Sequence, residues 1–201
     1  MKNTPLTNPA DYFRELAELL QKTQVTAEDG TALMLADGTK KAVDLILAVK
    51  SAGSKIMLIG NGGSAAIVSH IQNDLCDSVG VRAIVFNEAP FLTAVANDHG
   101  YETFFDKALR LWGEPEDLLI AVSSSGKSKS ILDAVKTARE KGIRILTFSG
   151  FFSENPLRQL GDLNFYVASQ KYGYVETAHA VLGHYLTDSA MASAKLEVKV
   201  P

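Results

Sequence analysis

The chain has 201 residues, of which 46% are hydrophobic and 21% charged, so it is long enough for one domain with a full core. This composition excludes a disordered chain and a small disulfide-rich scaffold. Twenty Lys and Arg against 23 Asp and Glu leave a net charge of −3, unlike the basic balance of general nucleic-acid binders. Because Cys76 is the single cysteine and every apolar run is shorter than a membrane span, we expect a cytoplasmic protein with no nucleic-acid or membrane partner.

Helical patterns come first in the chain. Asn8-Pro9 is a helix-start signal, and apolar residues follow it at helical spacing. The polar stretch 26–39 contains the pairs Asp29-Gly30 and Asp37-Gly38, which predict turns, and residues 42–52 predict a second helix. We therefore interpret residues 1–54 as an N-terminal helical arm and residues 55–201 as a single globular unit.

From residue 55 onward, strand patterns alternate with helical patterns. Most of the strands are continuous apolar runs, which is typical of strands buried on both faces. A long helical pattern from Tyr174 to Ala194 ends the series. The order predicts an α/β fold with a doubly wound, five-stranded parallel sheet of the flavodoxin-like order 2-1-3-4-5. The expected strands are Lys55–Gly60, Arg82–Phe86, Asp117–Ser123, Ile143–Ser149 and Asn164–Ser169.

Two of these strands end in loops rich in glycine or serine, Gly60–Ala65 and Ser123–Ser128, and a helical pattern follows each loop. Both loops leave the carboxyl edge of the sheet, where backbone N–H groups, hydroxyls and a helix N-terminus attract anions. One such loop alone is as often a tight turn with an N-cap serine. Two of them on neighbouring strands favour a phosphate site.

Two other phosphate motifs nearly match the loops. Gly60, Gly62 and Ala65 fit the loose dinucleotide fingerprint, which is a weak signal and leaves the serine loop without a role. Ser125–Ser128 resembles the end of a P-loop, but Ala121 stands where the leading glycine is required. A dinucleotide enzyme is therefore a minor alternative, and a P-loop nucleoside triphosphatase a weaker one.

Histidines and carboxylates recur on two of the expected helices. His70 and Asp74 are four residues apart and share a helix face, and Glu176 and His184 are eight apart and roughly share another. Two histidines and two carboxylates could form a zinc site if the helices meet. An isolated pair four residues apart is more often an exposed surface pair. His179 lies about 140° around the helix from His184, so we interpret it as a packing or supporting histidine.

Together the loops and the histidines resemble the sugar isomerase (SIS) domain family, and within it the phosphoheptose isomerases. The resemblance is carried by Ile59–Leu75, Val95–Phe105, Ile120–Val135 and Val175–Leu186. It implies an aldose–ketose isomerase that converts sedoheptulose 7-phosphate to D-glycero-D-manno-heptose 7-phosphate through an enediol. It also implies zinc as cofactor and a homotetramer whose neighbouring subunits complete each active site.

The resemblance assigns roles to individual residues. Asp74 or Glu176 would be the catalytic base and His184 the acid. The zinc ligands would be His70, Asp74, Glu176 and His184. The sugar phosphate would bind to Asn61, Gly62, Gly63, Ser64, Asp98, Ser123, Ser124, Ser125 and Ser128.

The sequence departs from the family pattern at two of these positions. Asp74 stands where the family has Glu, which shortens the reach of the carboxylate by about 1.5 Å. Glu176 stands where the family has Gln and could share the work of metal ligand or base. Two alternatives therefore stay open. One is a non-catalytic SIS-domain assembly protein that associates with a replication initiator, and the other is an isomerase of a different phosphosugar.

Overall fold

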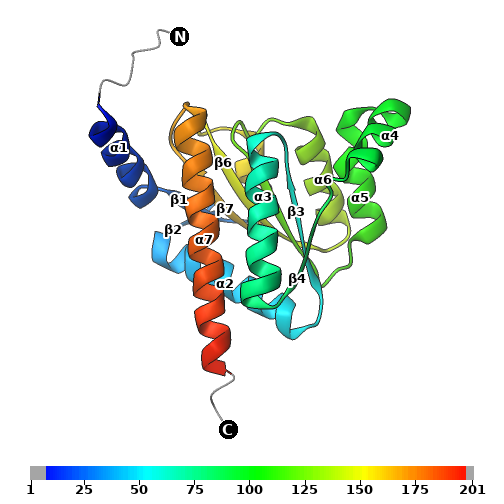
Figure 1. Cartoon of the computed structure of the whole chain (residues 1–201), viewed down its shortest axis with the longest axis horizontal. Coiled ribbons are helices and arrows are strands. Elements are labelled where there is room, and N and C mark those ends of the chain that lie inside the picture. Colours follow the sequence, from blue (N-terminus) through cyan, green and yellow to red (C-terminus); the bar gives the residue numbers. More distant parts are fainter. Residues whose placement is uncertain (1–7, 198–201) are drawn as a thin grey trace.

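A computed structural model describes residues 8–197, which form a central sheet with helices on both faces (Figure 1). Five strands are parallel, and they lie side by side in the order β4-β3-β5-β6-β7. Counted along the chain from β3, this is the flavodoxin-like order, so the predicted fold and strand order are confirmed. The strands are β3 (Lys55–Gly60), β4 (Arg82–Val85), β5 (Leu118–Ser123), β6 (Arg144–Gly150) and β7 (Leu163–Val167).

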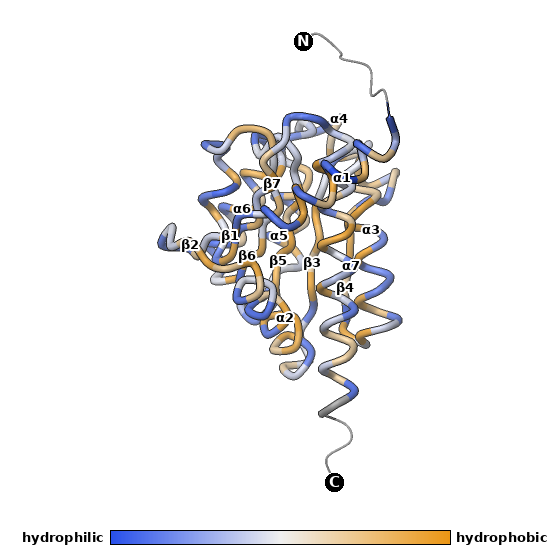
Figure 2. The backbone as a smooth tube through the Cα atoms, turned by 90° about the vertical axis from the view of Figure 1, so that its left-hand side faces the viewer, coloured by the Kyte–Doolittle hydropathy of each residue, from blue (hydrophilic) through white to orange (hydrophobic). Residues whose placement is uncertain are grey.

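Two layers of helices bury the sheet. α2 (Leu35–Ser51), α3 (Gly63–Asp74) and α7 (Tyr172–Glu197) cover one face, and α4 (Ala89–His99), α5 (Phe104–Trp112) and α6 (Lys129–Glu140) the other (Figure 1). Alternate residues of β5 enter the two cores, Ile120 on the α7 side and Ala121 on the α6 side. The central strands are therefore hydrophobic along their length (Figure 2), which explains their continuous apolar runs.

Two antiparallel strands extend the sheet beyond β7, and the sequence analysis did not predict them. β1 (Gln24–Ala27) pairs with β7, and β2 (Ala32–Leu33) pairs with β1. Asp29 forms the expected turn between them, where its Oδ1 accepts a hydrogen bond from the Thr31 N–H at 2.9 Å. The sequence does not reveal them because strands of four and two residues are too short to show a hydrophobic period. Because they pair with the sheet, this part of the chain is not an all-helical arm.

The second helix is longer than expected. α2 begins at Leu35, and Asp37-Gly38, which the sequence predicted as a turn, lies within its first turns. Gly38 and Thr39 are buried there, and Ile46 belongs to the same core as β3 and β5. Packing against that core outweighs the local turn preference of an Asp-Gly pair.

The first helix lies on the outside of this body. α1 (Pro9–Gln21) begins at the predicted cap, where Asn8 Oδ1 accepts a hydrogen bond from the Ala10 N–H at 2.9 Å. None of its residues is buried. It contacts the start of α7, where Tyr12 stacks on Tyr174 with ring centroids 4.4 Å apart.

Three short helical segments complete the described structure: the π-helix Leu75–Val79, which directly follows α3, and the 3₁₀ helices Tyr101–Thr103 (η2) and Pro156–Gln159. Among residues 8–197, no helix combines the length and the hydropathy needed to cross a bilayer.

Candidate functional site

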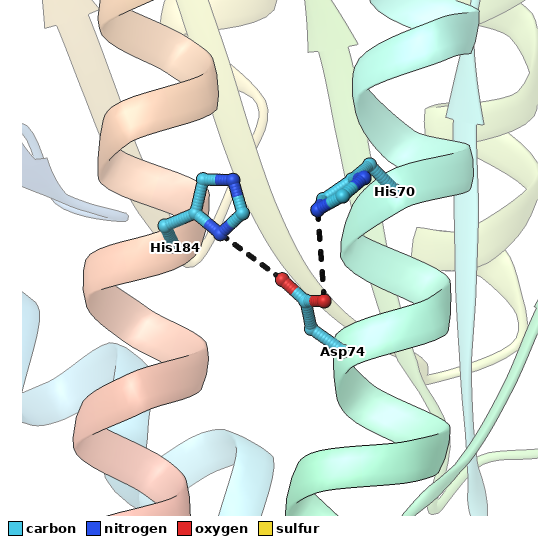
Figure 3. Close-up of side chains that lie close together, drawn as sticks. All are labelled: His70, Asp74 and His184. Carbon is cyan, nitrogen blue, oxygen red and sulfur yellow. Dashed lines mark ion pairs between the residues drawn. The ribbon is translucent and has the colours of Figure 1, made fainter.

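Three of the four predicted metal ligands meet between α3 and α7 (Figure 3). Asp74 lies between the two histidines, with one carboxylate oxygen 3.7 Å from His70 Nε2 and the other 3.1 Å from His184 Nδ1. One ligand atom from each residue lies within 4.8 Å of the others. The Asp74 side chain is only 18% exposed, whereas those of His70 and His184 are 60% and 51% exposed. The group is therefore buried on the side of Asp74 and open to solvent on the side of the two histidines.

A close helix contact brings these residues together. Gly183, next to His184, faces Ile71 of α3, and a Cβ on this glycine would lie 2.5 Å from Ile71 Cδ1. A larger residue at position 183 would displace the Ile71 side chain from this contact between the two helices. A glycine inside a helix lowers helix stability, and here it allows the approach that the site requires.

Glu176 lies away from this group. Two helical turns separate it from His184, a rise of about 12 Å along α7. Its carboxylate packs instead against the first loop, because a Cβ on Gly63 would lie 2.4 Å from Glu176 Oε2. A side chain at position 63 would therefore displace the Glu176 carboxylate from the loop. The predicted fourth zinc ligand, Glu176, therefore lies at the glycine and serine loops, whereas His70, Asp74 and His184 cluster further along the helices.

The two predicted loops enclose one cavity, as expected from the neighbouring positions of β3 and β5. Its volume is about 190 Å³. Ser124 is buried, and its hydroxyl has no hydrogen-bond partner among the described residues. An unpaired buried hydroxyl in a cavity is suited to a polar ligand. The polar residues that line the cavity are Asn61, Ser64, Ser123, Ser124, Ser125, Ser128, Tyr172 and Glu176.

A second cavity of about 350 Å³ lies on the other side of the first loop. Gly62 and Tyr101 line it, and Asn61 lines both cavities. The sequence analysis did not single out Tyr101 or Tyr172 as site residues. Tyr172 stands one helical turn before Glu176, and this spacing could have indicated a shared face. No local pattern could have indicated Tyr101, which reaches Asn61 from forty residues further along the chain.

Two other candidate residues lie outside these cavities. Asp98 is exposed near the end of α4 and accepts a hydrogen bond from Asn97 Nδ2 at 2.8 Å. It is not among the residues that line either cavity. His179 is buried, and its Nε2 donates to the Ser149 carbonyl at 3.1 Å. Burial lowers the pKa of His179 to about 4, which keeps the ring neutral at pH 7. The interpretation of His179 as a packing residue is confirmed.

Known proteins are similar to this chain in sequence and in fold. The model of the SIS domain family matches residues 11–150. A phosphoheptose isomerase of Burkholderia pseudomallei is 37% identical over 164 residues, which are 76% of this chain and 83% of the relative. One from Mycobacterium tuberculosis is 35% identical over 162 residues, 77% of this chain and 82% of the relative. The solved structure of a phosphoheptose isomerase from Neisseria gonorrhoeae superposes with a TM-score of 0.79 at 26% identity, covering 91% of this chain and 96% of the other. The chain therefore belongs to the SIS domain family, among its phosphoheptose isomerases.

Proposed function

We propose that the chain is an isomerase that converts sedoheptulose 7-phosphate to D-glycero-D-manno-heptose 7-phosphate. The observation that carries the proposal is that two chemically different groups lie along the same pair of helices. Donor-rich loops lie at the start of α3, and the His70, Asp74 and His184 group lies further along it. The curated relatives that bear the name phosphoheptose isomerase support the same reaction.

The separation of the two groups suits a seven-carbon sugar phosphate. Ser64 and His70 are separated by a rise of about 9 Å along α3. An extended chain advances about 1.1–1.2 Å per bond, and the eight bonds from C1 to phosphorus therefore span about 9 Å. With its phosphate between the loops, a heptose would place C1 and C2 beside His70. A triose phosphate bound at the same place would extend only about half of the distance from the loops to His70.

The loops would hold the phosphate. The N-termini of α3 and α6 and the hydroxyls of Ser64, Ser125 and Ser128 offer hydrogen-bond donors toward the cavity. Phosphate binding there would position the far end of the sugar at the histidines. The free energy of phosphate binding would then lower the activation free energy of the reaction at C1 and C2.

The His/Asp group would move the protons. Aldose–ketose isomerisation transfers one proton between C1 and C2 and another between the two oxygens. A carboxylate would take the carbon-bound proton, and His184 would exchange the oxygen-bound one. Asp74 is 3.1 Å from His184 Nδ1, so base and acid would be neighbours. This placement favours Asp74 over Glu176 as the base.

Zinc fits the same residues. Two histidines and one carboxylate are a common ligand set of catalytic zinc, which keeps another position open. His70, Asp74 and His184 would hold the ion, which when bound would supply a Lewis acid for the sugar carbonyl.

Removing a hydroxyl from the serine loop is expected to weaken substrate binding. Ser125→Ala and Ser128→Ala should each cost about 1–3 kcal/mol, because a charged acceptor loses a donor in a partly buried site. Titration calorimetry with sedoheptulose 7-phosphate measures this loss, with Ser51→Ala at the exposed end of α2 as the matched control. Unchanged affinity in both loop variants would place the phosphate elsewhere.

We also propose a homotetramer in which α1 contributes to the interfaces and neighbouring subunits complete the sites. The support is apolar surface that this chain leaves open. Phe13 of α1 is 65% exposed, and Val181 and Tyr185 of α7 are 42% and 53% exposed beside a groove between α1, α2 and α7. Light scattering should give about four times the chain mass of 21.7 kDa. A stable monomer that isomerises substrate would contradict the proposal.

The assembly-protein alternative makes the opposite prediction about activity. Such a protein needs the fold and the oligomer but not the His/Asp group, so the observed grouping of His70, Asp74 and His184 favours an enzyme. Purified protein should convert sedoheptulose 7-phosphate to an aldose phosphate faster than it converts a six-carbon ketose phosphate. A tetramer without either activity would favour the assembly protein, and preference for the shorter sugar would favour an isomerase of another phosphosugar.

We retain the cytoplasm as the expected compartment, because Cys76 is a free thiol.

A further inference from the structure

A hydrogen-bonded network joins three separate segments at the edge of the phosphate cavity. The side-chain amide of Asn61, in the first loop, donates to Ser128 Oγ at 2.8 Å and to Ser130 Oγ at 3.1 Å. The two serine oxygens are 3.2 Å apart. On the other side, the Tyr101 hydroxyl, from η2, donates to Asn61 Oδ1. Tyr101 and Ser130 have no role in the phosphate site as described so far.

The chemistry of these groups fixes the direction of the hydrogen bonds. A side-chain carbonyl oxygen only accepts, so Tyr101 must be protonated and must donate. Tyrosine is protonated at neutral pH, and partial burial raises the pKa of Tyr101 further. Both N–H groups of Asn61 are used, one on each serine, so each serine oxygen accepts one hydrogen bond.

The protons of the two serine hydroxyls complete the network. Either serine could donate across the contact between their oxygens. Ser130 is only 3% exposed and is not among the residues that line the cavity, so the arrangement in which Ser130 donates to Ser128 gives its buried proton an acceptor. Ser128 then accepts from both Asn61 and Ser130, which fills its two acceptor positions. Its own proton is left to point into the cavity that Ser128 lines. The network therefore makes Ser128 a donor, and a phosphate dianion offers only acceptors.

We propose that Tyr101 and Ser130 are positioning residues that act through Asn61 and commit the Ser128 hydroxyl to donating to the substrate phosphate. The inference rests on the proposed function, because it assumes that the phosphate occupies the serine-loop cavity. Neither residue needs to touch the substrate. Their effect should appear in binding of the phosphate and not in the proton-transfer step, since His184 and Asp74 lie at the other end of the site.

The experiment combines calorimetry with inorganic phosphate and steady-state kinetics with sedoheptulose 7-phosphate. Tyr101→Phe should weaken phosphate binding and raise KM by about 3- to 10-fold, the size of one neutral hydrogen bond, with kcat changed by less than about twofold. Ser130→Ala should act in the same direction. Ser51→Ala, at the exposed end of α2, is the control and should change neither quantity.

A double-mutant cycle separates positioning from general support of the fold. In a Ser128→Ala background, Tyr101→Phe should have no further effect on phosphate affinity, because the hydroxyl through which it acts is gone. An equal loss in both backgrounds, or no loss in the wild-type background, would overturn the inference. Because Tyr101 is 42% exposed, its variant decides the matter even if Ser130→Ala fails to fold.

The wild-type protein distinguishes this inference from the proposed function. If the wild type neither binds phosphate nor turns over the sugar, both proposals fail. If the wild type does both and Tyr101→Phe behaves like it, only the role of Tyr101 and Ser130 is rejected.

Discussion

Replacing His184 with alanine is expected to reduce isomerisation by about 10²–10⁴-fold or more, because the substitution removes the proposed acid and one member of the metal-binding group together. Steady-state turnover of sedoheptulose 7-phosphate measures the loss. His99→Ala is the matched control, since His99 is an exposed histidine at the end of α4. It should keep the activity of the parent protein.

The same variant tests whether the two ends of the site are separable. His184 belongs to the α3–α7 group and is not among the residues that line the loop cavity, so His184→Ala should bind inorganic phosphate within about twofold of the wild type. Turnover that survives the substitution would contradict the assignment of the reacting end. Loss of phosphate binding along with activity would point to a general structural defect.

The second large effect is expected at the carboxylates. Asp74→Asn should lower kcat by about 100-fold or more, the usual size of a general-base loss. Glu176→Gln should lower it by less than about tenfold, because Glu176 packs against Gly63 at the loops and not beside His184. Glutamine also keeps the length and one acceptor of the native side chain. Rapid-quench measurement of single turnovers compares the chemical step in the two variants.

Restoring the residues that the family carries at these positions gives the companion test. The double variant Asp74→Glu with Glu176→Gln should keep activity, because the base regains its longer reach and the loops keep a polar partner. A dead double variant, or a Glu176→Gln loss as large as that of Asp74→Asn, would show that the base is the carboxylate at the loops.

Much of the fold was predictable because its signals are local. Most of the five parallel strands are apolar runs, and each structural strand lies within about two residues of the prediction. The strands β1 and β2 were missed because they are only four and two residues long and become strands by pairing, β1 with the edge of β7 and β2 with β1. The start of α2 was missed for a similar reason, since its first turns are stabilised by burial of Gly38 and Thr39.

The candidate site was predictable only where its residues share an element. The pairing of His70 with Asp74 follows from their spacing on α3, and the serines of the loop from their place after β5. The approach of His184 depends on the contact of Gly183 with Ile71, which no single helix pattern contains. The position of Asp98 could not be predicted from its own helix either: the resemblance assigned it to the sugar, and the structure places it on exposed surface. The dinucleotide and P-loop interpretations matched single loops, whereas the SIS family model spans both.

The central claim is that this protein isomerises a heptose phosphate by moving a proton between C1 and C2. Its most direct test is to incubate the purified protein, loaded with zinc, with sedoheptulose 7-phosphate in deuterated water and to follow the sugar by NMR. We expect an aldose heptose 7-phosphate to form with deuterium at C2, since a base shared with solvent exchanges the transferred proton. Unchanged ketose with no deuterium at C1, from protein that is folded and assembled, would contradict the account.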